Sequence, residues 1–213
     1  MIYVMSDIHG CLDRYRNVLR QIRLRKDDHL YILGDVIDRG PDGLHILRDT
    51  MKRGNVTLLL GNHEHMMLEA LSHPGNDELL GLWYANGGRV THEHFKHCSL
   101  AYRAEVLWYI RSLPLNIEVS VNGTDYLLVH GAPASTYPKG SRFANQTEHA
   151  VWTRLGRNTP LFEDKIVIFG HTPTHHYNHE YPMAIWHARV LLWIEALFRQ
   201  HRGHCLVSSC ALQ

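Results

Sequence analysis

The stretch that decides the fold is Leu30-Tyr31-Ile32-Leu33-Gly34-Asp35-Val36-Ile37-Asp38-Arg39-Gly40-Pro41. A short apolar run that ends in a polar, glycine-containing turn is typical of a buried strand followed by a functional loop. Ile2–Met5 runs in the same way into Ser6-Asp7-Ile8-His9-Gly10, and Val56–Leu60 runs into Gly61-Asn62-His63-Glu64. Apolar residues at helical spacing lie between these runs. Alternating strands and helices predict an α/β fold with a parallel or mixed sheet.

Three further strands are expected in the second half of the chain. Ile117–Val121 and Tyr126–Val129 flank Asn122-Gly123, a dipeptide that favours a two-residue hairpin turn. Ile166–Phe169 predicts another buried strand, which ends at Gly170-His171.

The middle of the chain, residues 72–112, predicts a helical insertion that covers one edge of the sheet. A helix is expected over Ala101–Ile110, and Trp83-Tyr84 is expected in the core rather than in a ligand site. Three histidines, His92, His94 and His97, fall in a stretch that reads as a loop, and their spacing is more typical of solvated surface than of a third metal site.

Length and composition favour a single domain over residues 1–213. The formal net charge of +1 argues against a nucleic-acid binder, and no apolar run is long enough to span a bilayer. The N-terminus lacks the basic start of a signal peptide, and the four cysteines are scattered without a metal-binding or disulfide pattern. We therefore expect a cytoplasmic monomer with reduced thiols and no membrane partner.

Side chains that can bind metal follow each expected strand except the first of the hairpin pair. They are Asp7, His9, Asp35, Asp38, Asn62, His63, His130 and His171. Loops at the carboxyl ends of strands converge in α/β sheets, so these side chains are expected to meet. Oxygen and imidazole ligands suit Mn, Fe or Zn in an open site. The number of ligands exceeds what one tetrahedral ion needs and fits two ions that share a carboxylate.

These motifs, in this order, resemble the phosphoprotein phosphatase family of calcineurin-like phosphoesterases, in its lambda-type bacterial and phage serine/threonine phosphatase branch. The resemblance is carried by Asp-Ile-His-Gly, Gly-Asp-Val-Ile-Asp-Arg-Gly, Gly-Asn-His-Glu, His130-Gly131 and Gly170-His171-Thr172-Pro173, and it covers residues 2–174. It implies a four-layer α-β-β-α metallophosphoesterase sandwich of mixed sheets with helices on the outside.

The resemblance also implies a role for each site residue. Asp7 and His9 would hold the first of two divalent ions, Asp35 would bridge both, and Asn62, His130 and His171 would complete the second. The ions are expected to be Mn²⁺, with Fe or Zn as alternatives. His63 would be the general acid, oriented by Asp38, while Arg39, Arg154 and Asn62 would bind the phosphate. The expected reaction is hydrolysis of phosphoserine or phosphothreonine by direct attack of a hydroxide that bridges the ions.

Several of these residues also have ordinary structural interpretations. Asp38 and Arg39 could form an ion pair, and Arg154 could be a surface charge. We interpret Glu64 as a structural residue that caps a helix. Arg142 either contacts substrate or faces solvent. His175, His176 and His179 are expected on the surface.

The sequence departs from the family pattern in two places. The branch often has an arginine before Gly-Asn-His-Glu, where this chain has Leu60. The ending, residues 183–213, lacks the glycine-containing strand and hairpin of the family. Residues 184–199 predict either an amphipathic helix or the product of an out-of-frame ending, whose loss of terminal strands would leave a sheet edge unpaired. The coding DNA and an in-frame relative would distinguish these hypotheses.

Three functions remain open from the sequence. The first is hydrolysis of phosphomonoesters in proteins or small molecules. The second is hydrolysis of dinucleoside polyphosphates, although relatives with that activity typically read Ala-Arg-Gly-Pro and Asn-His-Asp where this chain has Asp38 and Glu64. The third is an inactive metal-binding protein that recognises phosphorylated partners. Asp38 and Glu64 favour the first function.

Overall fold

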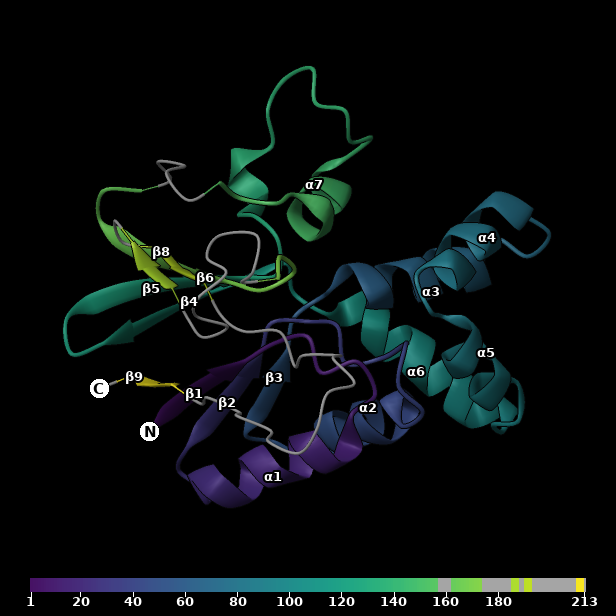
Figure 1. The fold of residues 1–213 in the computed structure, drawn as a ribbon, viewed down its shortest axis with the longest axis horizontal. Helices are drawn as coiled ribbons and strands as arrows, with labels where there is room; N and C mark the ends of the chain where they lie inside the picture. Colours follow the sequence, from purple (N-terminus) through teal and green to yellow (C-terminus); the bar gives the residue numbers. More distant parts are fainter. Residues whose placement is uncertain (157–161, 174–184, 188–189, 193–209, 213) are drawn as a thin grey trace.

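The computed structural model describes residues 1–156, 162–173, 185–187, 190–192 and 210–212 (Figure 1). The helices are α1 (Leu12–Ile22), α2 (Gly43–Lys52), α3 (Asn62–Ser72), α4 (Asp77–Ala85), α5 (Arg89–Lys96), α6 (Leu100–Ser112) and α7 (Gln146–Trp152), with a 3-10 turn at Ala134–Thr136. The strands are β1 (Ile2–Met5), β2 (His29–Ile32), β3 (Val56–Leu58), β4 (Asn116–Val121), β5 (Thr124–Val129), β6 (Lys165–Phe169), β7 (Ile185–His187), β8 (Val190–Leu192) and β9 (Cys210–Leu212). No described helix is long and apolar enough to cross a membrane.

The first sheet has the strand order β3-β2-β1-β9. Strands β1, β2 and β3 run parallel, and β9 is antiparallel to β1. Met5 pairs with Ile32, and Ile32 pairs with Leu58, so the three parallel strands end at the same level. The polar turns that follow them therefore leave one edge of the sheet together, as the sequence predicts.

The second sheet has the strand order β4-β5-β6-β8-β7. Asn122 and Gly123 connect β4 to β5 with positive φ angles of 50° and 78°, which confirms the predicted hairpin turn. Val129 of β5 pairs with Phe169 of the parallel strand β6. The residues that follow these two strands, beginning with His130, therefore also lie at one level.

The two sheets pack face to face, with helices on both outer sides (Figure 1). Val4, Leu33 and Leu59 of the first sheet pack against Leu128 and Ile168 of the second in a buried apolar cluster. Helices α1 and α2 cover the outer face of the first sheet, and the segment around α7 covers the outer face of the second. The four-layer α-β-β-α arrangement implied by the family resemblance is confirmed.

The predicted helical insertion is present as α4, α5 and α6, which fall within the predicted range 72–112. These helices pack on α2 and α3, and their apolar residues share a core with the edge strand β3. The predicted helix over 101–110 is confirmed as α6. The loop predicted around His92 and His94 is wrong: both lie on α5, whose buried face is formed by Thr91 and Phe95.

The described residues of the C-terminal segment form strands. Residues 185–187 and 190–192 are β7 and β8, so a helix over 184–199 is wrong at those positions. Strand β8 pairs with β6, and β9 pairs with β1, so the β1 edge is paired rather than open. His175, His176 and His179 lie outside the described residues. The out-of-frame origin of the ending stays a hypothesis.

The turns after β1 and β2 approach each other too closely for a side chain at Gly10. Gly10 has a φ angle of +68°, and a Cβ placed there would lie 2.6 Å from the carbonyl carbon of Gly40. The Gly10 N–H donates to the Val36 carbonyl at 2.8 Å, and the Gly40 N–H donates to the His9 carbonyl at 3.0 Å. These bonds hold the two turns together.

We predict that Gly10→Ala lowers the free energy of unfolding by about 2 kcal/mol or more, because it adds a strained φ to a backbone overlap. Urea unfolding measures the change. Gly54→Ala is the matched control, since a Cβ there meets nothing within 4 Å, and we expect a change within about 0.5 kcal/mol. Equal stability of the two variants would contradict this account of the turn contact.

Candidate active site

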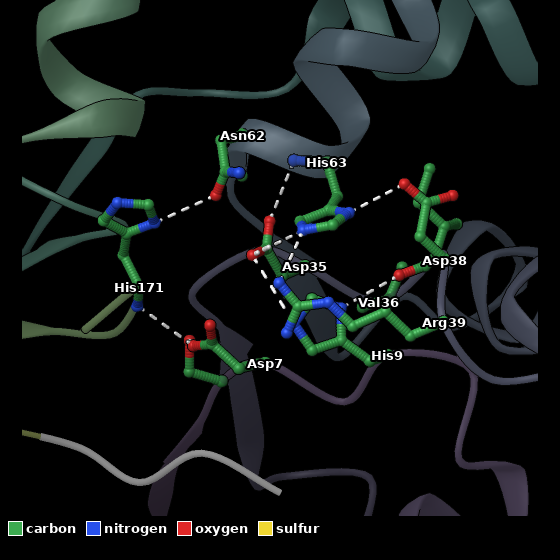
Figure 2. A network of polar contacts seen from close by, with 12 residues as sticks. Asp7, His9, Asp35, Val36, Asp38, Arg39, Asn62, His63 and His171 are labelled. Atoms are coloured by element: carbon green, nitrogen blue, oxygen red, sulfur yellow. Dashed lines mark hydrogen bonds and ion pairs between the residues drawn. The ribbon is translucent and has the colours of Figure 1, made fainter. Parts of the chain in front are cut away.

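The predicted site residues come from loops that the two sheets bring to one region (Figure 2). Each sits directly after a strand or at the start of a helix: Asp7 and His9 after β1, Asp35, Asp38 and Arg39 after β2, Asn62 and His63 at the start of α3, His130 after β5, and His171 after β6. Arg154 follows α7. Local strand endings therefore assemble a site from segments more than 160 residues apart.

The backbone turns sharply at these residues. Among the described residues, eight that are not glycine have a positive φ, and six of them are predicted site residues: Asp7, His9, Asp35, Asp38, Arg39 and His171. Such conformations cost about 1–3 kcal/mol each and persist only when the surroundings impose them. Six strained residues in one site indicate that the fold places these side chains at the expense of favourable backbone conformations.

Asp35 lies at the centre of the cluster (Figure 2). Its Oδ2 is 3.8 Å from His9 Nε2 and 4.0 Å from His63 Nε2, and its Oδ1 is 3.5 Å from His130 Nε2. Two groups of metal-competent side chains occur in the described part of the chain, and Asp35 belongs to both. One group adds His9 and His63, and the other adds His130 and His171.

The tautomers of two histidines are set by backbone carbonyls. His130 Nδ1 lies 2.6 Å from the Leu33 carbonyl, and His9 Nδ1 lies 3.1 Å from the Ile37 carbonyl. A carbonyl only accepts, so each Nδ1 carries the proton and each Nε2 keeps a lone pair. The His130 lone pair faces the Asn62 Oδ1, another electron-pair donor, at 2.9 Å. The two lone pairs repel each other, and a cation bound by both His130 Nε2 and Asn62 Oδ1 would remove this repulsion.

Asp7 and His171 complete this side of the cluster. The His171 N–H donates to Asp7 Oδ2 at 3.1 Å, and the Ser6 hydroxyl donates to the same oxygen. His171 Nδ1 lies 2.9 Å from Asn62 Oδ1. Asn62, which follows β3 of the first sheet, thus contacts the residues that follow β5 and β6 of the second sheet.

The site histidines are held in the form that binds metal. Burial is the largest cause that lowers the pKa of His9, His63, His130 and His171 below the usual value. These imidazoles are therefore neutral at physiological pH, with lone pairs available as ligands.

The central carboxylate is poorly compensated by the protein alone. Burial raises the pKa of Asp35 well above its usual value, and the nearby charges of Asp7 and Glu64 raise it further. A divalent cation would reverse this effect. The two groups that share Asp35 could each hold such an ion, one with His9 and His63 nearby and the other with His130 and His171. The predicted assignment of Asp7 to the first ion and of Asn62 to the second stays a prediction.

His63 is part of a buried hydrogen-bonded pair. His63 Nδ1 lies 2.7 Å from Asp38 Oδ2, and Arg39 Nη2 donates to His63 Nε2 at 3.1 Å. Burial raises the pKa of Asp38 to about 7. The geometry brings together the three residues to which the resemblance gives acid and phosphate-binding roles. Leu60, in place of the family arginine, is buried in the core and supplies no phosphate contact.

Glu64 does more than the helix capping that the sequence predicts. It is fully buried, and it accepts hydrogen bonds from the backbone N–H groups of Asp35, Val36 and Gly61 at 2.8, 2.9 and 3.2 Å. The Gly61 bond is the predicted cap. The other two hold the turn that presents Asp35. Nothing in the sequence around Glu64 indicates that its carboxylate contacts the turn at Asp35 and Val36.

Trp83 is the other residue whose role the sequence did not reveal. It is fully buried, as predicted for a core aromatic, whereas its neighbour Tyr84 is half-buried. Its indole Nε1–H donates to Asp38 Oδ2 at 2.8 Å. The two residues are 45 positions apart, and no local pattern links them.

Arg154 and Arg142 lie at the entrance of the site rather than in its buried network. Both are exposed, and both line a cavity of about 590 Å³ whose walls include Phe143, Trp152 and His171. The charge of Arg154 also contributes, after burial, to the lowered pKa of His171. The cavity therefore connects the candidate metal ligands to two arginines and two aromatic rings.

The geometry described above agrees with comparisons to known proteins. A sequence profile of the calcineurin-like phosphoesterase family matches residues 1–191. The chain belongs to this family. It is 32% identical to Serine/threonine-protein phosphatase 1 of Salmonella typhimurium, over 81% of this chain and 78% of that protein. It is also 32% identical to a symmetrical bis(5'-nucleosyl)-tetraphosphatase of Acidovorax sp., over 72% of this chain and 52% of that protein.

A solved structure of a metallophosphoesterase shares the fold. The crystal structure of a metallophosphoesterase from Sphaerobacter thermophilus superposes with a TM-score of 0.53 at 21% identity, covering 80% of this chain and 59% of that one. The family assignment made from the sequence motifs is confirmed, and with it a metallophosphoesterase that uses divalent metal ions. The role of each site residue stays a prediction.

We predict that Asp35→Asn makes the metal-free protein more stable and removes its response to metal. Asparagine keeps the acceptor for the His63 N–H, which lies 3.0 Å from Asp35 Oδ1, but removes a buried charge. We expect a gain of about 1 kcal/mol or more in chelator at about pH 8, because each pKa unit corresponds to about 1.4 kcal/mol. Wild type should gain about 2.7 kcal/mol from Mn²⁺ at one hundred times its Kd.

Thermal unfolding with chelator and with Mn²⁺ measures both effects. Asp27→Asn is the control, because Asp27 is exposed and should change neither quantity. An Asp35→Asn protein that keeps the full Mn²⁺ shift would contradict the placement of Asp35 between two metal sites.

Proposed function

We propose that this chain is a dimetal-dependent phosphatase that hydrolyses phosphoserine and phosphothreonine monoesters, in proteins or in small phosphoesters. The observation that carries the proposal is the buried contact of 2.7 Å between His63 Nδ1 and Asp38 Oδ2, with Arg39 beside His63 Nε2. Mn²⁺ is the expected metal.

The leaving group explains why this contact favours monoesters of serine and threonine. A serine or threonine alkoxide is strongly basic, so its departure needs a proton donor. A phosphate leaving group, as in a dinucleoside polyphosphate, is a weak base and departs without one. An imidazole held by a carboxylate is suited to the first reaction. The likeness to Serine/threonine-protein phosphatase 1 supports the same choice.

Each residue can be given a step in this reaction. The two cations, when bound, supply an activated water and neutralise phosphoryl charge. Arg39 turns from His63 Nε2 to the phosphoryl oxygens, which a guanidinium fork binds in pairs. Arg154 and Asn62 contact other phosphoryl oxygens.

Proton transfer completes the turnover. When Arg39 leaves Nε2 for the phosphate, the positive charge that together with burial lowers the pKa of His63 moves away, and His63 takes up a proton from solvent. As the bond between phosphorus and the serine oxygen breaks, His63 gives this Nε2 proton to that oxygen, and Asp38 stabilises the imidazolium through Nδ1. Water supplies the oxygen that phosphorus gains. The products are the free hydroxyl side chain and inorganic phosphate.

Hydrolysis of dinucleoside polyphosphates is the second candidate, and the cavity of about 590 Å³ favours it. Arg142 and Arg154 could bind a polyphosphate chain, and Phe143 and Trp152 could stack on a base. The 32% identity to the Acidovorax tetraphosphatase points the same way, although this chain spans about half the length of that protein.

We predict that metal-stripped protein releases phosphate from a phosphoserine peptide only after Mn²⁺ is added. His63→Asn should lower kcat on this peptide by about 100-fold or more, because general acid catalysis contributes that much. His65→Asn, two residues along the same helix and outside the hydrogen-bonded pair, is the control and should keep wild-type turnover. Phosphate release is measured beside hydrolysis of diadenosine tetraphosphate.

The two substrates separate the candidates. Faster turnover of diadenosine tetraphosphate, with little loss in His63→Asn, would favour the second candidate. Metal-loaded protein that binds the phosphoserine peptide without turnover would point to the third function, a phospho-recognition protein, and would overturn the proposal.

A further inference from the structure

Helix α4, helix α5 and the turn between them each make one hydrogen bond to Asp38 or Arg39. Trp83 Nε1 donates to Asp38 Oδ2 at 2.8 Å, Asp38 N donates to Thr91 Oγ1 at 3.0 Å, and Arg39 N donates to the Gly87 carbonyl at 3.1 Å. All three partners lie in the helical insertion. The insertion therefore contacts both the backbone and the side chain of the segment that holds the proposed acid and phosphate-binding residues.

This segment needs support from outside itself. Asp38 and Arg39 have φ angles of 68° and 64°, two consecutive residues in a conformation that side chains rarely adopt. The backbone N–H groups of both residues are satisfied, because Thr91 Oγ1 and the Gly87 carbonyl accept from them. A free loop of this sequence would relax away from such a backbone.

Trp83 fixes the side chain of Asp38. The Oδ2 atom of Asp38 lies within hydrogen-bond distance of both His63 Nδ1 and the Trp83 indole, whereas its Oδ1 has no hydrogen-bond partner among the described residues. The indole is itself immobilised, because it is fully buried and Gly88 leaves no room between the ring and the backbone. Trp83 and His63 are thus the side chains that contact Oδ2, and Thr91, which accepts from the Asp38 N–H, also lies beside the carboxyl group.

We propose that Trp83 is a positioning residue for proton donation: its indole N–H holds Asp38 so that Asp38 holds His63 toward the leaving oxygen. This proposal rests on the proposed phosphatase function. Without the indole N–H, the Asp38 carboxylate loses a donor that fixes its Oδ2, and His63 loses a firmly placed acceptor. Trp83 acts through two other residues and touches no substrate.

The proposal has a signature that a general structural role lacks. A misplaced proton donor slows reactions in proportion to how much the leaving oxygen needs a proton. A serine alkoxide needs one, whereas p-nitrophenolate is a far weaker base and departs unprotonated. Loss of the indole N–H should therefore slow phosphoserine hydrolysis and spare hydrolysis of p-nitrophenyl phosphate.

Two replacements of Trp83 test this signature in the metal-loaded protein. Trp83→Phe removes the N–H together with part of the ring, and site-specific replacement by benzothienylalanine removes the N–H while keeping the ring shape. We expect kcat on a phosphoserine peptide to fall about tenfold, a part of the general acid contribution, with KM within about twofold of wild type. On p-nitrophenyl phosphate, kcat should fall less than about twofold.

Tyr15→Phe is the matched control. Tyr15 is also a buried aromatic residue that donates to a carboxylate, Asp49 Oδ2 at 2.7 Å, but it lies on α1 outside the site. Its loss should leave the ratio of the two kcat values unchanged. Thermal unfolding of each variant shows whether it is folded, and the benzothienylalanine protein decides the question if Trp83→Phe does not fold.

Three outcomes would bear on the proposal. An equal fall of kcat on both substrates, or wild-type kcat on both, in the benzothienylalanine protein would overturn it. A selective fall on the phosphoserine peptide supports it. Wild-type protein that hydrolyses neither monoester would instead overturn the proposed function, which this design therefore tests separately.

Discussion

A carboxylate buried without a matching charge is the constraint on which this site depends. Asp35 lies between two groups of neutral imidazoles, close to the carboxylates of Asp7 and Glu64, and burial opposes its ionised form. Such a group is tolerated only when cations or hydrogen-bond donors compensate it. Glu64 holds the turn that carries Asp35, because its carboxylate accepts hydrogen bonds from the backbone N–H groups of Asp35 and Val36. The atoms around Asp35 do not balance its negative charge, and bound metal ions would do so.

The same constraint explains the unusual backbone around the site. Ligands from five strands can converge on one point only if the chain turns at once after each strand, and six of the predicted site residues adopt positive φ to do so. That strain is balanced by contacts elsewhere, such as the close approach of Gly10 to Gly40 and the packed interface between the sheets. The strained turns lower the local stability of the fold, and in return the candidate metal ligands are in position in the metal-free protein.

How far the sequence predicted the site depends on how local each interaction is. The ends of the strands, the hairpin at Asn122-Gly123 and the convergence of the candidate ligands could be predicted. These features depend on the spacing of apolar residues and on turn residues, which act within a few positions of the chain. The grip of Glu64 on the Asp35 turn could not be predicted, since it depends on how two loops pack. The helix that carries His92 was also missed, because polar residues on its exposed face hide the short apolar pattern of its buried one.

The hydrogen bond from Trp83 to Asp38 shows why the insertion matters for chemistry and not for folding alone. The metal ligands come from the strands that the layered fold brings together, but the proposed proton donor is held from a different part of the chain. Proton donation therefore has a support from α4 that acts on Asp38, in addition to the bond from the His63 backbone N–H to Asp35 that it shares with the metal-binding residues. Because only a basic leaving group needs the support from α4, changes in α4 and α5 can alter which phosphoesters react without moving a metal ligand. On the proposed mechanism, substrate preference would therefore depend on the insertion as well as on the metal-binding loops.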